Sequence, residues 1–268
     1  MQPERIWELM KKDWSEAFRS KQILLSMTVL PAFMALGVPI IFLLSISFAT
    51  SGNTDPELAV LLNFLPPLTQ DWEFLTERAR SYVLMSVFGL LFLLLVPVMI
   101  TSFVGTDAIV GEKERDTIEG LLALPLTESE ILAAKIGSSL IPVLVLTWLL
   151  SGLYVVIVDI ITFQDLNRLL LPDLRFILVI LLFTPLLSLA TTEFIVMISS
   201  RVSSTRDAQQ LTGLFVLPVM LLVVSQLFVL LIDVWLILLG IVILGGFDLL
   251  AFKFAIKIFN RENLMSAT

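Results

Sequence analysis

The sequence predicts an all-α membrane protein with six transmembrane helices, an amphipathic interfacial helix before them and a short cytoplasmic helix between the second and third. Hydrophobic residues make up 57% of the chain and charged residues only 15%, whereas a soluble domain carries about 25% charged residues. The mean hydropathy is +0.98. One water-soluble core cannot hide so much apolar side chain, so lipid must solvate part of it.

Six apolar runs follow one another along the chain, and a bilayer core needs roughly 20 apolar residues per helix. The fourth and sixth runs reach this length only when Glu193 and Asp248 are counted inside them. The first run is about twice as long as the apolar region of a cleaved signal peptide, so we expect it to stay as a span. One transmembrane domain, 23–254, then contains spans at about 23–50, 81–106, 136–158, 174–198, 208–232 and 234–254.

Prolines occur within these runs at positions 31, 39, 97, 142, 185 and 218. Transmembrane helices tolerate proline because neighbouring groups satisfy the carbonyls that it leaves without a partner. We therefore expect kinks at these positions, and not helix ends.

The placement of lysine and arginine predicts that both termini are cytoplasmic. Cytoplasmic loops of membrane proteins carry an excess of these residues. Of the 17 in this chain, the predicted external loops hold only Arg78, Arg80, Arg168 and Arg175. We expect a multi-pass protein of the cell (cytoplasmic) membrane, with residues 255–268 as a cytoplasmic tail.

Composition also excludes several function classes. The chain has no cysteine and no histidine, which removes thiolate metal sites, the commonest general base and the commonest zinc ligand. A net charge of −7 argues against a nucleic-acid binder. The chain also lacks a Gly-x-x-x-x-Gly-Lys-Ser/Thr phosphate loop, because Gly105 and Gly111 have the wrong spacing and Glu112 follows. We expect no catalytic residue, no metal and no cofactor bound by this chain.

Residues 1–22 predict an amphipathic helix. Trp7, Met10, Trp14 and Phe18 recur at helical spacing and form one apolar stripe. Tryptophan together with lysine suits the headgroup plane of a bilayer. Two interpretations have equal weight: a simple interfacial anchor, or an anchor that also contacts a cytoplasmic partner.

The cytoplasmic loop 107–135 predicts two helical pieces. Asp116 with Glu119, and Thr127 with Glu130, each fit a capping box. Pro125 ends the first piece, at about 116–124, and the second runs from about 128 into the third span. The first piece carries exposed leucines, and an exposed apolar patch rimmed by charge commonly meets a partner. On spacing alone, these leucines could equally fold back on the membrane surface.

Two stretches of sequence carry a resemblance to a known family. The first is Gly111-Glu-Lys-Glu-Arg-Asp-Thr-Ile-Glu119, followed by Leu121-Leu-Ala-Leu-Pro-Leu126 and Glu130-Ile-Leu-Ala-Ala-Lys135. The second is Ser199-Ser-Arg-Val202 with Arg206-Asp-Ala-Gln-Gln210. With these motifs the chain resembles the ABC-2 family of membrane subunits of ABC exporters. The short external turn after the fifth span departs from many relatives, which place re-entrant helices there.

The resemblance implies a function and partners. A coupling helix at about Thr117–Leu124 would dock on a separate ATPase subunit, which would bind ATP and Mg²⁺. The helix before the first span would also lie near the ATPase. Two such permease subunits, identical or homologous, would pair through spans one and five, and substrate would cross between them. The residues implied in coupling are Gly111, Glu112, Glu114, Arg115, Thr117, Glu119, Leu121, Leu122 and Pro125.

Glu193 and Asp248 are the deepest ionisable residues. A carboxylate inside a membrane is costly and is a candidate functional group. Both lie near the cytoplasmic ends of their spans, so helix packing or gating at the inner mouth competes with a proton or cation site. The alternative function for the whole chain is an ATPase-independent secondary transporter or ion channel. The middles of the six spans are uncharged, which argues against this alternative.

Overall fold

The computed structural model describes residues 3–48, 62–63, 67–69, 71–115, 117, 126–199, 202, 204–214 and 234–258, and within them the regular structure is helical throughout. The predicted all-α class is therefore confirmed for this part of the chain. The α-helices are α1 (Pro3–Arg19), α2 (Lys21–Ala32), α3 (Val38–Phe48), α5 (Glu77–Glu114), α7 (Glu128–Leu166), α8 (Leu174–Leu178), α9 (Thr184–Ser199) and α11 (Val234–Ile258). Two π-helical turns, η1 (Phe33–Gly37) and η3 (Val179–Phe183), and a 3₁₀ turn, η2 (Trp72–Phe74), complete the set.

Within the described residues, five helical segments are long and apolar enough to cross a membrane: Ile23–Phe48, Glu77–Glu114, Ser129–Leu166, Leu174–Ile198 and Val234–Ala255. They match the first four predicted spans and the sixth. The predicted fifth span, 208–232, lies mostly outside the described residues, which include only its beginning in the helical stretch 205–214.

Two of these helices are much longer than a bilayer requires. At 1.5 Å per residue, α5 with 38 residues and α7 with 39 residues are each about 57 Å long, against a hydrocarbon core of about 30 Å. The predicted spans 81–106 and 136–158 cover only their apolar middles. Both helices therefore project beyond the bilayer, α5 as far as Glu114 and α7 from Glu128.

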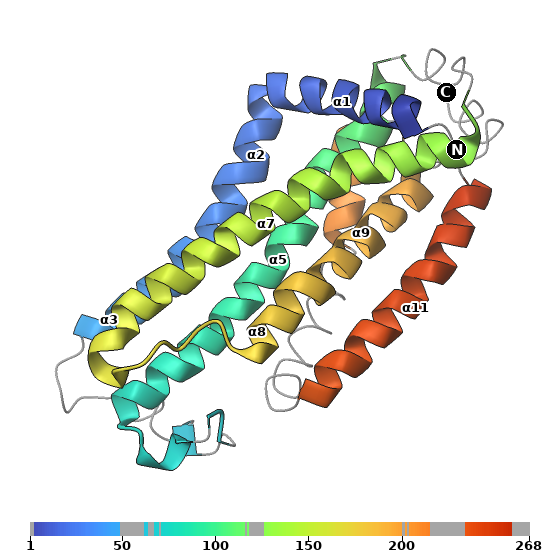
Figure 1. Cartoon of the computed structure of the whole chain (residues 1–268). Coiled ribbons are helices and arrows are strands. Elements are labelled where there is room, and N and C mark those ends of the chain that lie inside the picture. The colour runs from blue at the N-terminus through green and yellow to red at the C-terminus, as the bar shows by residue number, and fades with distance from the viewer. Residues whose placement is uncertain are drawn as a thin grey trace.

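Buried apolar side chains form three layers along the bundle. We call the end where α1 lies across the other helices the α1 end (Figure 1). There, one cluster joins residues from five helices, including Met10, Ile109, Ile131, Val196 and Ala255. A large central cluster follows. A third, around Trp72, Val83 and Leu84, lies at the opposite end.

The layers give the direction of each helix. α5 runs from the opposite end toward the α1 end, and α7 runs back. α9 and α11 both run toward the α1 end, because Gly240 faces Phe183, Gly245 faces Leu186, and Val196 and Ala255 meet in the α1-end cluster. These two neighbours are therefore parallel.

Prolines lie within the helices, as predicted. Pro31, Pro97 and Pro142 are inside α2, α5 and α7, and Pro218 lies outside the described residues. Each π-helical turn precedes a proline: the middle residues of η1 and η3 are Ala35 and Leu181, four residues before Pro39 and Pro185. Since proline offers no N–H to the carbonyl four residues earlier, the wider turn accommodates the interrupted ladder.

The chain reverses sharply after α7. Asn167 adopts a left-handed conformation with φ of 50°, which ends the helix. The Asp159 carboxylate then accepts hydrogen bonds from the N–H groups of Leu170 and Leu171, at 2.8 and 3.1 Å. This carboxylate thus holds the turn after α7 through its Oδ1 atom.

One close contact between α5 and α7 depends on a missing side chain. The buried Tyr154 of α7 crosses Gly89 of α5 and donates its hydroxyl hydrogen to the Ser86 carbonyl, 3.0 Å away. A Cβ atom at Gly89 would lie 1.8 Å from the Tyr154 oxygen. Gly89 is therefore required by packing.

We predict that Gly89→Ala lowers the stability of the purified protein by about 1–3 kcal/mol, the usual cost of overpacking. The matched control is Gly152→Ala on α7, where nothing lies within 4 Å of the added methyl group. Alanine has the higher helix propensity, so this control should be neutral or slightly stabilising. Thermal unfolding in detergent measures both, and equal midpoints for the two variants would contradict the contact.

Candidate functional site

The candidate site lies where α1 crosses the projecting ends of α5 and α7. The chain leaves α5 at Glu114 and enters α7 at Glu128, so this crossing lies at the base of the cytoplasmic loop. One face of α1 is buried there: Met10 packs so closely on α7 that a Cβ atom at Gly137 would lie 3.0 Å from the Met10 Cε atom. α1 is thus packed on protein at this point.

A buried lysine joins the three helices. The Lys135 side chain at the start of α7 is only 1% exposed. Its Nζ atom lies 2.9 and 3.0 Å from the two carboxylate oxygens of Asp13 on α1, and 3.0 Å from Glu112 Oε1 on α5. Ser138 also donates to Asp13, at 2.9 Å. One ammonium group therefore balances acids from two other helices.

Neighbouring groups tune the charges around this lysine. Burial raises the pKa of the Asp13 carboxyl, and the Lys135 ammonium and Ser138 hydroxyl oppose that rise. For Lys12, which lies 3.1 Å from Glu112 Oε1, burial lowers the pKa of the ammonium group, but the carboxylates of Glu112, Glu16 and Asp13 together outweigh this effect, so the net change is upward. Glu112 Oε1 thus accepts a hydrogen bond from Lys12 and forms an ion pair with Lys135.

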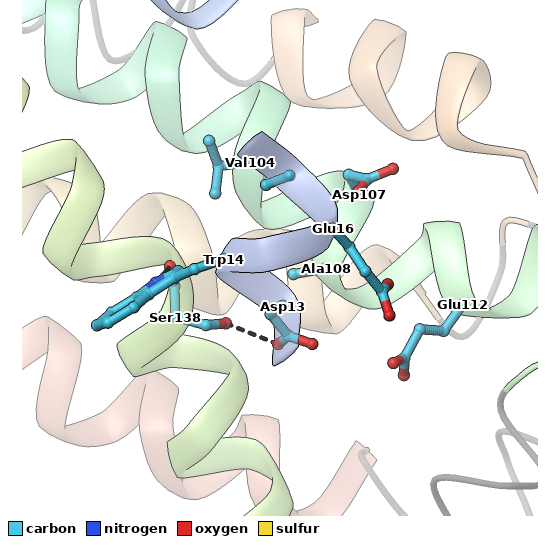
Figure 2. Close-up of a pocket in the computed structure, with 9 residues that line it drawn as sticks. Asp13, Trp14, Glu16, Val104, Asp107, Ala108, Glu112 and Ser138 are labelled. Carbon is cyan, nitrogen blue, oxygen red and sulfur yellow. Dashed lines mark hydrogen bonds between the residues drawn. The ribbon is translucent and has the colours of Figure 1, made fainter. Parts of the chain in front are cut away.

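A more exposed layer surrounds the buried one. Arg115, just after α5, pairs with Asp107 of α5 and with Glu16 of α1, the latter at 3.5 Å. Figure 2 shows α1 crossing here, with a small pocket lined by acidic side chains from α1 and α5 and by Trp14 and Ser138. We call the whole set the α1 junction: Lys12, Asp13, Trp14, Glu16, Asp107, Glu112, Arg115, Lys135 and Ser138.

Trp14 supplies a hydrogen bond that the helix α7 cannot make for itself. Pro142 has no N–H, so the Ser138 carbonyl four residues earlier has no helical partner. The indole N–H of Trp14 donates to that carbonyl at 2.8 Å. α1 therefore supplies the hydrogen bond that Pro142 removes from α7, and the same bond fixes the position of α1 on α7.

The second cytoplasmic segment reaches the same region. The backbone N–H of Thr205 donates to Glu114 Oε2 at 3.1 Å. Val110 of α5 forms a small buried cluster with Val202 and Ala208. The two sequence stretches around 111–115 and 202–208 therefore meet at the end of α5.

The charged side chains of the α1 junction hold helices together. The described residues contain no group of three or more acidic, histidine or cysteine side chains placed to hold a metal. The charges of the α1 junction instead pair with one another across helices. A displacement of the loop base must therefore move α1, α5 and α7 together.

A family model described as ABC-2 family transporter protein matches residues 7–237. This range includes most of α1, the loop and both motif stretches. The chain belongs to the ABC-2 transporter family. The predicted resemblance is thereby confirmed, and with it a membrane transport component that is not itself catalytic. Among curated proteins, none matches this ABC-2 transporter chain.

The predicted coupling residues fall into three groups in this ABC-2 transporter. Gly111 and Glu112 are buried, while Glu114, Arg115 and Thr117 are exposed. Thr117 folds onto the end of α5, where its N–H donates to the Glu112 carbonyl at 2.9 Å. The predicted coupling helix lies outside the described residues, together with Glu119, Leu121, Leu122 and Pro125.

The position of Glu112 changes its interpretation. Because its side chain is 3% exposed and paired with Lys12 and Lys135, it holds α5 against α1 and α7. Its role in coupling stays a prediction. By contrast, the predicted capping box of α7 is confirmed: the Thr127 hydroxyl oxygen accepts from the Glu130 N–H at 3.3 Å, and Glu130 accepts from the Thr127 N–H at 3.0 Å.

The predicted apolar stripe of the N-terminal helix is divided. Residues 3–19 do form a helix, but Met10 is buried and Trp14 half-buried against α7, while Trp7 and Phe18 are 45% and 50% exposed. Trp7 meets Trp14 edge-on, with ring centroids 5.4 Å apart. That the exposed pair lies in the headgroup plane stays a prediction.

Sequence reasoning missed Asp13 and Lys135. One signal was available: Asp13 follows Met10 by three residues, so an acid stands on the apolar face of α1. A charge in that position predicts a buried partner. The identity of the partner, 122 residues away, is not encoded in local spacing.

We predict that Trp14→Phe destabilises this transporter by about 1–3 kcal/mol, because it leaves the Ser138 carbonyl buried without a donor. Adding Pro142→Ala should recover most of the loss, since alanine restores the helical N–H to that carbonyl. The control is Trp7→Phe, which alters the same ring type where it is 45% exposed. Absence of rescue in the thermal unfolding of the double variant would contradict the argument.

We predict that Lys135→Met costs about 3–5 kcal/mol, the usual effect of removing one partner from a buried ion pair. Asp13 and Glu112 would remain buried without their shared cation. Lys11→Met is the control, because Lys11 pairs with Glu8 in the open, where such pairs contribute about 0–1 kcal/mol. Restoring stability by combining Lys135→Met with Asp13→Asn and Glu112→Gln would confirm that unbalanced charge causes the loss.

Proposed function

We propose that this chain is the membrane permease subunit of an ATP-driven ABC-2 exporter, coupled through the 111–135 loop to a separate ATPase subunit. The observation that carries this proposal is the α1 junction. It fastens both arms of the loop to α1 through Lys135 and its two acids, at 2.9–3.0 Å. Such a base transmits force only if something outside the chain applies it.

The proposed partner supplies the energy. This chain lacks a phosphate loop, so ATP and Mg²⁺ would bind to the ATPase. Two ATPase subunits closing on nucleotide would displace the coupling helices predicted at 117–124. The ATPase drives transport only if it binds one membrane conformation more tightly than the other. The capped start of α7 and the unbroken end of α5 are rigid enough to pass that displacement to the membrane-spanning parts of both helices.

The proposed assembly contains two permease subunits, identical or homologous, with the substrate pathway between them. In a single copy, α2, η1 and α3 expose many large apolar side chains, among them Leu25, Val29, Phe33, Ile41, Phe42 and Phe48. This surface suits lipid and a second subunit alike. Spans one and five are the interface that the family resemblance favours.

The proposed topology has six crossings with both termini in the cytoplasm of the cell. The parallel direction of α9 and α11 is consistent with a further crossing between them in the sequence. The α1 end, where Lys12, Arg115 and Lys135 gather, would be the cytoplasmic side. Arg78 and Arg168 mark the other side: Arg78 pairs with Asp165, 3.5 Å away, and Arg168 with Asp71.

An ATPase-independent secondary transporter or channel is the second candidate. The observation that favours it is the buried pair Glu193 and Asp248, since carboxylates inside a membrane serve ion-coupled transport. Against it stands the loop base, for which a transporter without an ATPase has no use. Co-purification separates the two candidates, because only an exporter subunit should retain a nucleotide-hydrolysing protein.

We predict that Glu119→Lys combined with Leu121→Asp uncouples transport while the protein stays folded. These positions are chosen because the buried Glu112 would confound the result with instability. The matched control is Glu8→Lys, a charge reversal on the exposed face of α1.

Two quantities are measured: the ATPase activity that co-purifies with the tagged chain, and the dependence of transport on nucleotide in reconstituted vesicles. The double variant should lose at least ten-fold of the retained ATPase, a change of about 1.4 kcal/mol in association, whereas Glu8→Lys should keep it. Full retention by the double variant, or transport by the purified chain without nucleotide, would refute the proposed coupling.

A further inference from the structure

Two buried acids lie on neighbouring helices, Glu193 on α9 and Asp248 on α11. Glu193 is 2% exposed and Asp248 is 6% exposed. The helices carrying them are packed together: Leu186, seven residues before Glu193, lies 3.9 Å from the position of a Cβ atom at Gly245, three residues before Asp248.

Neither acid has a partner among the described residues that would balance it. Glu193 Oε2 and both oxygens of Asp248 are buried without a hydrogen bond. The neighbouring hydroxyls are already engaged, because Thr191 and Thr192 donate to the carbonyls of Leu187 and Ser188 within α9. Unpaired buried acids are rare because they cost free energy.

No described basic group reaches the pair. The packed elements bring few charges: α9 has no other charged residue, η3 has none, and α8 has only Arg175 at the opposite end of the bundle. On α7 and α5, Lys135 is bound to Asp13 and Glu112, and Asp107 is bound to Arg115. Lys113 of α5 and Lys253 of α11 form no ion pair or hydrogen bond with either acid; Lys253 is exposed.

Two negative charges in such surroundings would repel strongly, so something must neutralise at least one. A metal cation would require more ligands than this pair offers, since hard cations take about six to eight oxygens and no larger acidic group is present in the described part of the chain. A proton needs only one carboxyl oxygen. Protonation is the usual way in which a buried carboxyl group without a partner loses its charge.

We propose that Glu193 and Asp248 form a proton-binding site that holds one exchangeable proton while α9 and α11 are packed together. When the proton leaves, both carboxylates are charged and the two helices repel. Binding and release of the proton are therefore linked to the spacing of α9 and α11. This site does not depend on the ATPase, and it stands or falls separately from the proposed coupling.

The test is infrared spectroscopy of the purified full-length chain in lipid nanodiscs, recorded across a pH series. The C=O stretch of a protonated carboxyl group should be present at neutral pH and should disappear at alkaline pH. Glu193→Gln and Asp248→Asn should each remove this pH-dependent signal. The matched control is Asp159→Asn, which removes a buried carboxylate that already accepts two N–H groups and should leave the signal unchanged.

A second measurement is independent of spectral assignment. The thermal midpoint of the unmodified chain should fall as the pH rises from about 4 to the pH at which the infrared signal disappears, because the unfolded chain has released the proton and the folded chain still holds it. The Glu193→Gln, Asp248→Asn double variant should lack that fall. A signal that persists in both single variants, or that disappears on adding sodium or potassium at constant pH, would overturn the proton assignment, the latter in favour of a cation site.

Discussion

The Lys135 ammonium group is the interaction on which the α1 end of this transporter depends. It is buried, and it is shared by Asp13 of α1 and Glu112 of α5. Taking three charges out of water is costly, and their attraction offsets that cost only in good geometry. The three helices are therefore held to one arrangement, in which a shift of any one of them separates opposite charges in a region of low polarity.

This constraint explains why the loop base suits a coupling role. The hydrogen bond from Trp14 to Ser138 and the capping box at Thr127 fix α7 at two further points. Thr117 and Arg115 fold back onto α5 at the other arm of the loop. Because both arms are tied to α1, a force on the loop rotates or shifts the helices as a unit instead of bending the connection.

The sequence predicted what depends on local pattern. Apolar run length placed five of the spans, and the spacing of Thr127 and Glu130 placed the start of α7. It could not predict contacts between distant segments. Nothing near Pro142 indicates that the indole of Trp14, 128 positions earlier, donates to the carbonyl that the proline leaves free. No local pattern indicates that Glu112, which the family resemblance implies in coupling, is buried. Likewise α5 and α7 extend past the apolar runs at the α1 end, where their polar residues pack and pair with α1.

The two buried charge sites have opposite consequences for motion. At the α1 junction the charges are balanced, so α1, α5 and α7 stay together. Between α9 and α11 the acids are balanced only by a proton, so that contact is the weaker one electrostatically. The two regions meet at Gly105 of α5, where a Cβ atom would lie 3.1 Å from Ile195 and 3.6 Å from Ser139. A displacement of α5 and α7 therefore pushes directly on α9 two residues from Glu193, and the contact that yields should be the one between α9 and α11.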